Sequence, residues 1–249
     1  MNQVISFSGG KDSTAMLLKM LENGEDIHSV VAFDTGWEFP QMLEHWDQVE
    51  EYTGIPITRL HPRYDFTESL FTRPIKKRDG TTRCGNGWPS WNRRWCTREK
   101  IEAIDRYVND LDGDSVVCIG FASDESSRVD SKEITNKKYG TRFPLIELGL
   151  TEENSLKVCT DAGFDWGGLY EEFSRLSCFC CPLQTLDNLR SVKKLTPDLW
   201  DKMLDMDVGG SFHGYDSVLD LHKRFEEEEH LGKSFNIREY NRKVKKDES

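Results

Sequence analysis

The chain has 249 residues, of which 31% are charged and 37% hydrophobic, and its formal net charge is −11. No apolar run approaches the roughly 20 residues that a membrane-spanning helix requires, so we expect no contact with a membrane. Such an acidic chain is also not expected to bind polyanions indiscriminately. Residues 1–5 enter a strand-like segment at once and lack the charged and apolar regions of a signal peptide, so we expect a cytoplasmic protein.

Strand-like and helix-like segments alternate over the first half of the chain. Short apolar runs predict strands at 4–7, 29–33, 55–60 and 115–121. The segments between them predict helices at 12–23, 40–53 and 97–111. Strands that alternate with helices imply crossover connections, and these imply a parallel α/β sheet.

The composition changes near residue 150. Helices are predicted at 151–162, 185–195, 197–206 and 216–231, and the third begins with the cap Thr196 followed by Pro197. The charged tail from residue 241 is expected to be frayed. We therefore expect an α/β domain over residues 1–150 and a helical region over 151–249 that carries a cysteine cluster.

A glycine-containing string follows the first predicted strand. The residues Ser8–Ser13 read SGGKDS and lead into the first predicted helix, at the sheet edge where open α/β proteins bind ligands. The glycines let the backbone turn sharply, and the N–H groups at the helix start, with the Ser13 and Thr14 hydroxyls, can hold phosphate oxygens. Lys11 can add a positive charge, and Asp12 can help to hold Mg²⁺. The string is neither the dinucleotide fingerprint nor a Walker A loop, and a plain glycine turn is the alternative.

The string matches the PP-loop of the adenine-nucleotide α-hydrolase-like superfamily, whose members share a Rossmann-like (HUP-type) fold and cleave ATP between the α and β phosphates or handle adenylyl sulfate. Within it the chain resembles the phosphoadenosine phosphosulfate (PAPS) reductase family, because Asp34–Pro40 is similar to its second-strand motif and Gly120–Arg128 to its fourth-strand loop. The resemblance spans residues 4–128. It implies a Rossmann-like parallel sheet with helices on both faces, and ATP or PAPS with Mg²⁺ as ligands.

The loop and the two motifs give the expected nucleotide site, in which Lys11 and Asp12 are the expected catalytic residues. The expected nucleotide-binding residues are Ser6, Ser8, Gly9, Gly10, Lys11, Asp12, Ser13, Thr14, Asp34, Thr35, Gly36, Gly120, Asp124, Glu125 and Arg128.

Two features depart from the family pattern. Ala122 stands where the fourth-strand loop usually carries an arginine, which removes one expected contact to phosphate or sulfate. The C-terminal Glu-Cys-Gly motif of the reductases is missing, since the last cysteine is Cys181. Reduction of PAPS by the usual chemistry is therefore disfavoured.

Seven cysteines, an odd number, argue for reduced thiols or metal ligation rather than a disulfide framework. Cys178 and Cys181 form a Cys-x-x-Cys pair that can hold a metal or an iron–sulfur cluster. Cys96 lies where relatives place a ligand, and Cys84 or Cys180 can supply the fourth. Similarity to the sulfurtransferase-like branch, which includes the enzyme that puts sulfur into the DNA backbone, favours [4Fe-4S], while Zn²⁺ is also acceptable.

The alternative for this cluster is that its cysteines are small buried hydrophobic residues. Two further cysteines, Cys118 in a predicted strand and Cys159 in a predicted helix, are expected in the core.

Residues 73–95 contain Trp88, Trp91 and Trp95 and show little periodicity, so we expect a long loop or lid there. The wider range 73–100 is a local positive segment. The nine basic residues, opposed by Asp79 and Glu99, are Arg73, Lys76, Lys77, Arg78, Arg83, Arg93, Arg94, Arg98 and Lys100. Such a segment can contact a nucleic-acid acceptor through phosphates and stacked bases. The interpretation we favour is a lid whose tryptophans pack on the sheet and whose arginines cover ATP.

Together these features predict an ATP-dependent enzyme that adenylates an acceptor, releases pyrophosphate, and then transfers sulfur with release of AMP. A sulfur-donor protein is a possible partner, and an oligomer is possible. The alternatives are PAPS or adenylyl sulfate reduction with Cys178 or Cys181 as the nucleophile, and a binding module without turnover.

Overall fold

The computed structural model describes residues 1–129, 138–207, 211–214 and 216–235. By their contacts, the residues divide into a first unit, Met1–Gly87 with Arg94–Phe179, and a second unit, Trp88–Arg93 with Cys180–Ser249. The division falls after Phe179 and not near residue 150, because the helix that follows residue 150 packs against the first helix of the chain. Within the described residues, no helix is both long and apolar enough to cross a membrane.

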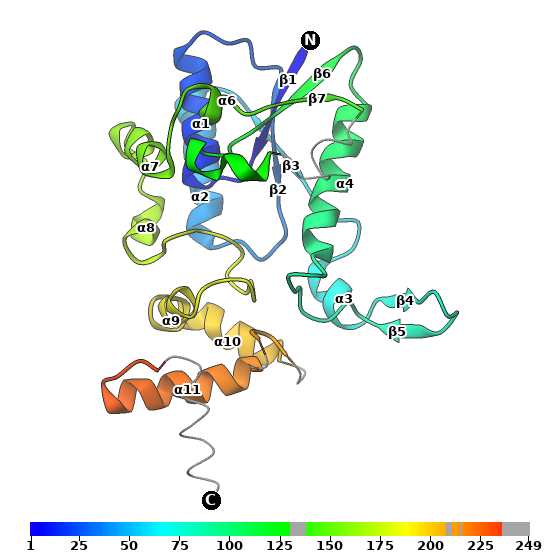
Figure 1. The fold of residues 1–249 in the computed structure, drawn as a ribbon, viewed down its shortest axis with the longest axis vertical. Helices are drawn as coiled ribbons and strands as arrows, with labels where there is room; N and C mark the ends of the chain where they lie inside the picture. The colour runs from blue at the N-terminus through cyan, green and yellow to red at the C-terminus, as the bar shows by residue number, and fades with distance from the viewer. Residues whose placement is uncertain (130–137, 208–210, 215, 236–249) are drawn as a thin grey trace, which may run out of the picture. The chain divides into compact units, whose positions relative to one another are not determined.

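The first unit is built on a parallel sheet of five strands (Figure 1). The strands are β1 (Asn2–Phe7), β2 (Ser29–Phe33), β3 (Ile57–Leu60), β6 (Ser115–Ile119) and β7 (Gly140–Arg142), in the order β3-β2-β1-β6-β7. Every neighbouring pair is parallel, which confirms the predicted α/β fold with a Rossmann-like sheet. The short edge strand β7 was not predicted, because its three residues include a glycine and carry no apolar run.

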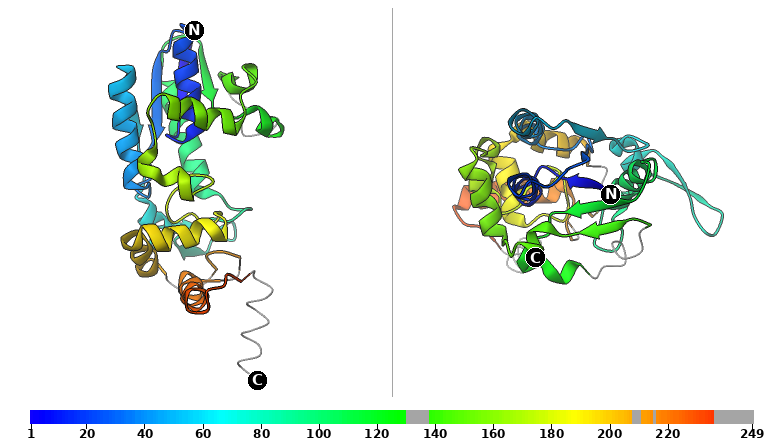
Figure 2. Two further views of the ribbon diagram at one scale, coloured as in Figure 1. Left: turned by 90° about the vertical axis from the view of Figure 1, so that its left-hand side faces the viewer. Right: turned by 90° about the horizontal axis from the view of Figure 1, so that it is seen from above.

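The strand order reverses at β1, and helices consequently cover both faces of the sheet. Right-handed crossovers place α1 (Lys11–Glu22) and α2 (Pro40–Thr53) on one face and α4 (Trp95–Asn109) on the other (Figures 1 and 2). Ile104 and Val108 of α4 pack against Val4, Val31 and Val117 of the sheet. Each such fully buried side chain contributes about 1.5–3 kcal/mol.

The long helices begin and end where the local sequence indicates. Pro40 is the first residue of α2, and Gly54 ends the helix in the left-handed conformation with φ of 69°. Helix α7 (Glu152–Asp161) is capped by Thr151, whose side chain accepts from Asn154 N–H. α7 packs along α1, which is why it belongs to the first unit.

Shorter elements that the sequence did not predict connect the main ones. They are α3 (Phe66–Phe71), η1 (Ser123–Arg128), α6 (Pro144–Glu147), η2 (Trp166–Gly168) and α8 (Leu169–Glu172). Each spans two turns or fewer, so periodicity carries little signal over these lengths.

The segment expected to be an irregular loop over residues 73–95 contains a β-hairpin. β4 (Pro74–Lys76) and β5 (Thr82–Cys84) pair antiparallel, and Lys77–Gly80 form the turn between them. The two strands inside the expected long loop were not predicted, because each has only three residues and neither alternates clearly between polar and apolar side chains.

The second unit is helical, as predicted for its part of the chain. It contains α9 (Leu186–Leu195), α10 (Pro197–Asp205) and α11 (Val218–Leu231). Trp88 joins its core by packing edge-on against Phe212, with ring centroids 4.8 Å apart. Buried Arg224 pairs with Glu228 at 3.1 Å. The tail from residue 241, which we expected to be frayed, lies outside the described residues.

Candidate functional site

A cavity of about 330 Å³ opens in the first unit where the strand order reverses. Ser6 and Ser8 line it from the end of β1, and Ile119 and Gly120 line it from the end of β6. The carboxyl ends of β1 and β6 diverge here because their crossovers leave on opposite faces of the sheet. In open α/β sheets this crevice is the position where nucleotides bind.

Two glycines allow the backbone to pass close to its neighbours at this cavity. Gly9 has φ of +79°, and a Cβ atom on it would lie 2.0 Å from Nε1 of Trp46. The Gly9 carbonyl accepts a 2.7 Å hydrogen bond from Trp166. A Cβ on Gly120 would lie 3.0 Å from the Ser13 amide nitrogen. The loop therefore requires glycine at 9, and the tight approach of β6 to α1 favours glycine at 120.

The hydroxyl groups of the loop are oriented by one another. The Oγ atoms of Ser8 and Ser13 lie 3.1 Å apart, and the Ser8 N–H donates to Ser13 Oγ at 3.2 Å. Gly10 caps α1 without a side chain that could accept from the first-turn amides. One of these amides, that of Lys11, donates to the Tyr170 hydroxyl at 2.9 Å. The positive end of α1 thus faces the cavity, as an anion site requires.

Lys11 is only 7% exposed, and two carboxylates hold its ammonium group. Its Nζ lies 2.6 Å from Glu152 Oε2 and 3.2 Å from Asp12 Oδ2. Burial lowers the pKa of Lys11, but Glu152 and Asp12 outweigh burial and raise its pKa above the ordinary value. Lys11 is therefore charged at neutral pH. Burial raises the pKa of Asp12, against the lowering effect of Lys11.

Asp12 offers an oxygen suited to a cation. Its Oδ1 atom is buried and has no hydrogen-bond partner among the described residues. The carboxylates of Glu125 and Glu152 also line the cavity and are close enough to raise the pKa of Asp12. Mg²⁺ is held in proteins by one or two carboxylates together with the substrate's phosphates, so Asp12 with one of these neighbours fits it without a preformed group of three ligands.

The cavity lining also includes Thr35, Glu38, Lys100 and Cys178. The Thr35 hydroxyl donates to Glu38 Oε1 at 2.9 Å and lies 3.5 Å from the Cys178 sulfur. Phe179 N–H donates to the carbonyl of Trp37 at 3.0 Å, which fixes Cys178 beside the end of β2.

Glu38 and Lys100 have pKa values displaced by their surroundings. Burial raises the pKa of Glu38, with Thr35 and Lys100 opposing it. Burial lowers the pKa of Lys100, with Glu38 and the Cys178 thiol opposing it. Such displaced groups in one cavity are typical of reactive sites.

Most of the expected nucleotide-binding residues meet in this cavity. Those that line it are Ser6, Ser8, Gly10, Lys11, Asp12, Ser13, Thr35, Gly120 and Glu125. Five do not line it, namely Gly9, Thr14, Asp34, Gly36 and Asp124. The side chain of Arg128 is not among those described.

Three of the residues outside the lining make polar contacts within the fold. Thr14 is fully buried, and its hydroxyl lies 2.9 Å from His45 Nε2. Asp34 Oδ1 accepts from Gly36 N–H at 2.8 Å and so shapes the turn after β2. Asp124 Oδ1 accepts from Glu152 N–H at 3.3 Å and so positions the carboxylate that holds Lys11.

Five titratable lining residues were missed in the sequence. Glu38 lies inside the second-strand motif and Lys100 inside the basic segment, so both carried a signal that was not used. Glu152, Tyr170 and Arg175 come from the part of the chain assigned to a separate domain. Lys11 and Glu152 are 141 residues apart in sequence, and no local pattern links them.

The cysteines have different environments. Cys118 and Cys159 are fully buried, as predicted for core residues. Cys84 is exposed on the hairpin, Cys96 is partly buried, and burial raises the pKa of the Cys96 thiol.

The expected metal ligands divide between the two units. Cys84, Cys96 and Cys178 belong to the first unit, whereas Cys180 and Cys181 belong to the second. Among the described residues, no three His, Cys, Asp or Glu side chains form a group that could hold a metal. The [4Fe-4S] or Zn²⁺ site therefore remains a prediction.

The lid that we favoured for the basic segment stays a prediction. Trp95 is buried in the first unit, whereas Trp88 is buried against Phe212 of the second unit and not on the sheet, and Trp91 is 72% exposed. Of the nine basic residues, the cavity lining includes Lys100. The hairpin cations are not part of this lining.

A Rossmann-like sheet with a phosphate loop at its reversal point defines a nucleotide-binding α/β protein of the PP-loop type. Residues 2–184 match the model of the phosphoadenosine phosphosulfate reductase domain, and the chain belongs to that family.

Two similar proteins come from Methanocaldococcus jannaschii. The uncharacterized protein MJ0066 is 30% identical over 207 residues, which cover 80% of this chain and 40% of that protein. The uncharacterized protein MJ0973 is 25% identical over 209 residues, 81% of this chain and 46% of that protein. The chain thus spans less than half the length of each of these relatives.

Proposed function

We propose that the chain is an ATP-dependent enzyme that adenylates an acceptor and releases pyrophosphate. The observation that carries the proposal is the cavity at the reversal point, where the start of α1, Lys11 and Asp12 meet the end of β6. Fixed N–H groups and a buried ammonium group stabilise negative charge best where water is excluded. An ATP polyphosphate matches this set of donors.

In the proposed step, an oxygen of the acceptor attacks the α-phosphorus of ATP. The bond from this phosphorus to the oxygen that bridges to the β-phosphate breaks, and pyrophosphate leaves with the electron pair. Lys11 and the first-turn amides of α1 stabilise the charge on the phosphates, and Asp12 with Glu125 or Glu152 would hold Mg²⁺, which supplies further charge neutralisation. Glu152 keeps Lys11 protonated and in place.

We propose that the adenylated acceptor is then attacked by sulfur. Cys178 lines the same cavity as the phosphate loop, so a sulfur nucleophile delivered there would approach the adenylate and displace AMP. A sulfur-donor protein would supply this nucleophile.

Iron and zinc analysis with an anaerobic visible spectrum tests for the cysteine cluster: iron with a broad visible band supports [4Fe-4S], and a colourless zinc protein refutes it.

The adenylation is tested with ATP labelled at the α- and γ-phosphates. Labelled pyrophosphate and an acceptor that carries the α-label, or AMP once a sulfur donor displaces it, support the proposal when they form only with a suitable acceptor. Release of ADP and inorganic phosphate refutes it. Tight ATP binding with no product for any acceptor would instead indicate a binding module without turnover.

A second candidate is thiol-dependent cleavage of PAPS or adenylyl sulfate, which the position of Cys178 inside the cavity favours. The thiolate would attack the sulfur atom, and the adenosine phosphate would leave with the bridging oxygen. A thiol donor would then release sulfite and form a disulfide. Sulfite release that is abolished in Cys178→Ser and retained in Cys118→Ser supports this candidate over adenylation.

A further inference from the structure

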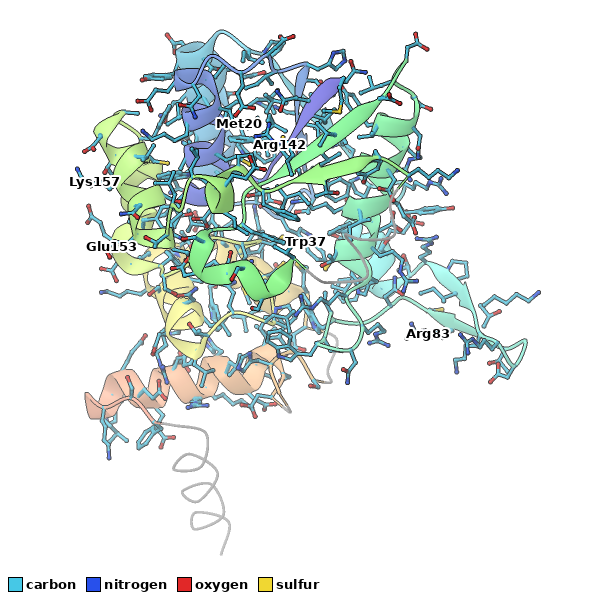
Figure 3. All side chains as sticks on the ribbon, turned by 45° about the horizontal axis from the view of Figure 1, so that its top comes forward. Met20, Trp37, Arg83, Arg142, Glu153 and Lys157 are labelled. Atoms are coloured by element: carbon cyan, nitrogen blue, oxygen red, sulfur yellow. The ribbon has the colours of Figure 1, made fainter. Side chains whose placement is uncertain are left out.

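The β4–β5 hairpin carries a concentrated positive charge on a protein with a net charge of −11. It projects from the rest of the first unit, and the labelled Arg83 lies on it (Figures 1 and 3). Residues 73–84 contain five basic side chains, Arg73, Lys76, Lys77, Arg78 and Arg83, against the single carboxylate of Asp79. Lys76, Lys77 and Arg78 are all exposed around the turn.

The carboxylate of Asp79 does not pair with these cations. Its Oδ1 accepts from the Thr81 N–H at 2.9 Å and from the Thr81 hydroxyl at 2.6 Å, and these bonds stabilise the turn. These bonds lower the pKa of Asp79 and keep it ionised. Within the described part of the chain, Lys76, Lys77, Arg78 and Arg83 form no ion pair with any carboxylate.

Several basic residues elsewhere in the first unit are paired. Arg142 contacts Glu25 at 2.7 Å and Glu147 at 2.6 Å, and Lys11 contacts Glu152. Even Arg73, at the base of the hairpin, pairs with Glu99 at 3.4 Å and stacks on Tyr64 at 3.8 Å. A chain with excess carboxylates thus leaves its exposed hairpin cations without counter-charges, which favours an external anion as their partner.

The hairpin is also held firmly at its base. The Gly85 N–H donates to the Arg73 carbonyl at 2.8 Å, and Asn86 N–H donates to the Ser69 carbonyl at 2.8 Å. Gly85 has φ of +63°, and a Cβ on it would lie 2.1 Å from the Leu70 carbonyl oxygen. The base of the arm is therefore fixed against α3.

We propose that this hairpin binds the phosphate backbone of a nucleic acid. Its two-stranded ribbon has the width that the major groove of a duplex admits, and cations on such a ribbon contact phosphates without reading sequence. A nucleic acid presents an extended row of phosphate charges, which suits several neighbouring cations that have no carboxylate partner in the described part of the fold. This inference does not depend on the proposed adenylation.

The test compares two triple variants that lower the net charge equally, from −11 to −14. Lys76→Gln/Lys77→Gln/Arg78→Gln removes the hairpin charge, and Lys157→Gln/Lys194→Gln/Lys202→Gln removes three exposed lysines elsewhere. Fluorescence anisotropy with labelled duplex DNA, single-stranded DNA and duplex RNA measures binding at several salt concentrations. ATP binding is measured in every variant, so that a defect in the nucleotide site is detected separately.

We expect the wild type and the control triple to bind at least one of these probes, and the hairpin triple to bind it at least about 10-fold more weakly. The slope of log K against log salt should decrease in magnitude by about 3 in the hairpin triple, close to 0.9 for each phosphate that the variant no longer neutralises. The probe bound most tightly identifies the nucleic-acid class.

Three outcomes would overturn the inference. They are no binding of any probe by the wild type at about 50 mM salt, equal weakening in both triples, and binding of poly-glutamate as tightly as the nucleic acids. The first outcome would show that the protein does not bind nucleic acid. The second would attribute binding to the net charge of the protein, and the third would indicate an acidic protein as the partner.

Discussion

The phosphate-loop cavity and the β4–β5 hairpin both carry positive charge, but the cation is buried and paired in the cavity and exposed and, among the described residues, unpaired on the hairpin. In the cavity Lys11 is buried, and carboxylates 2.6 and 3.2 Å away raise its pKa. On the hairpin Lys76, Lys77 and Arg78 are exposed and form no ion pair within the described residues. A buried cation needs a partner because desolvation is costly, whereas an exposed one is stable in water. The first arrangement suits a specific small anion, and the second suits an extended one.

The largest effect is expected from Gly9→Ala, at the loop. The left-handed φ and the 2.0 Å approach to Trp46 should lower the free energy of unfolding by about 3 kcal/mol and abolish ATP binding. Urea unfolding and calorimetry measure the two effects. Gly24→Ala is the control, because its φ of +70° is similar but no atom lies within 4 Å of its Cβ, and it should cost about 1 kcal/mol. Equal losses in both variants would show that the approach to Trp46 is unimportant.

Lys11→Met tests whether the buried charge of the cavity binds phosphate. Loss of a charge-assisted hydrogen bond of about 1.5–3 kcal/mol should weaken ATP binding about 10- to 100-fold. Titration calorimetry measures the affinity. Lys19→Met, on the same helix but pairing with exposed Glu22, should change it less than about 2-fold. An unchanged affinity in Lys11→Met would mean that Glu152 and Asp12 neutralise the ammonium group fully.

The buried His45 ring lies beside the Thr14 hydroxyl of α1, and its protonation should lower the stability of the first unit at acid pH. Burial lowers the pKa of His45 to about 3, below the value of about 6.5 in the unfolded chain. The unfolded state therefore binds more protons between these values, and stability falls as the pH falls from about 6.5 towards 3. Between pH 7 and 5 this contribution amounts to about 2 kcal/mol.

Urea unfolding at the two pH values measures this effect as a difference between variants. His45→Gln should lose the His45 contribution to the pH dependence, and His28→Gln, at an exposed position, should retain it. A wild-type pH dependence in His45→Gln would show that other groups cause it.

Tyr170→Phe removes the hydroxyl that accepts from the Lys11 amide. If an incoming phosphate oxygen takes this amide, wild-type binding must first break a hydrogen bond worth about 1 kcal/mol. We therefore expect Tyr170→Phe to bind ATP about 5-fold more tightly and to be slightly less stable. Weaker binding would show instead that the hydroxyl itself contacts the nucleotide. Calorimetry distinguishes the two.

The smallest effect on stability is expected at the hairpin. Lys76→Gln/Lys77→Gln/Arg78→Gln should change the free energy of unfolding by less than about 0.5 kcal/mol, because exposed, unpaired charges contribute little to folding. Urea unfolding provides the measurement. A large loss would show that these cations have a structural role, which would end the contrast between the two regions.

The sequence by itself determined the parallel sheet, its long helices and the phosphate loop. Apolar runs mark β1, β2 and β6, and Pro40 with Gly54 bounds α2. The loop was predictable because strand, glycine turn and helix are contiguous, so local backbone rules fix their geometry. Parallel strands then bring Thr35 and Gly120 to the same edge of the sheet.

Only the tertiary structure decided which side chains complete the site and which stay outside it. Glu152 and Tyr170 reach Lys11 because α7 packs along α1, and this contact also moves the division of the chain to Phe179. Thr14 was predicted to bind phosphate, but its hydroxyl lies beside His45 Nε2 and does not line the cavity. The same sequence pattern of basic residues yielded one cavity residue, Lys100, and a projecting hairpin. Pairing of charges depends on which distant segments meet in space, and a local sequence pattern does not encode that.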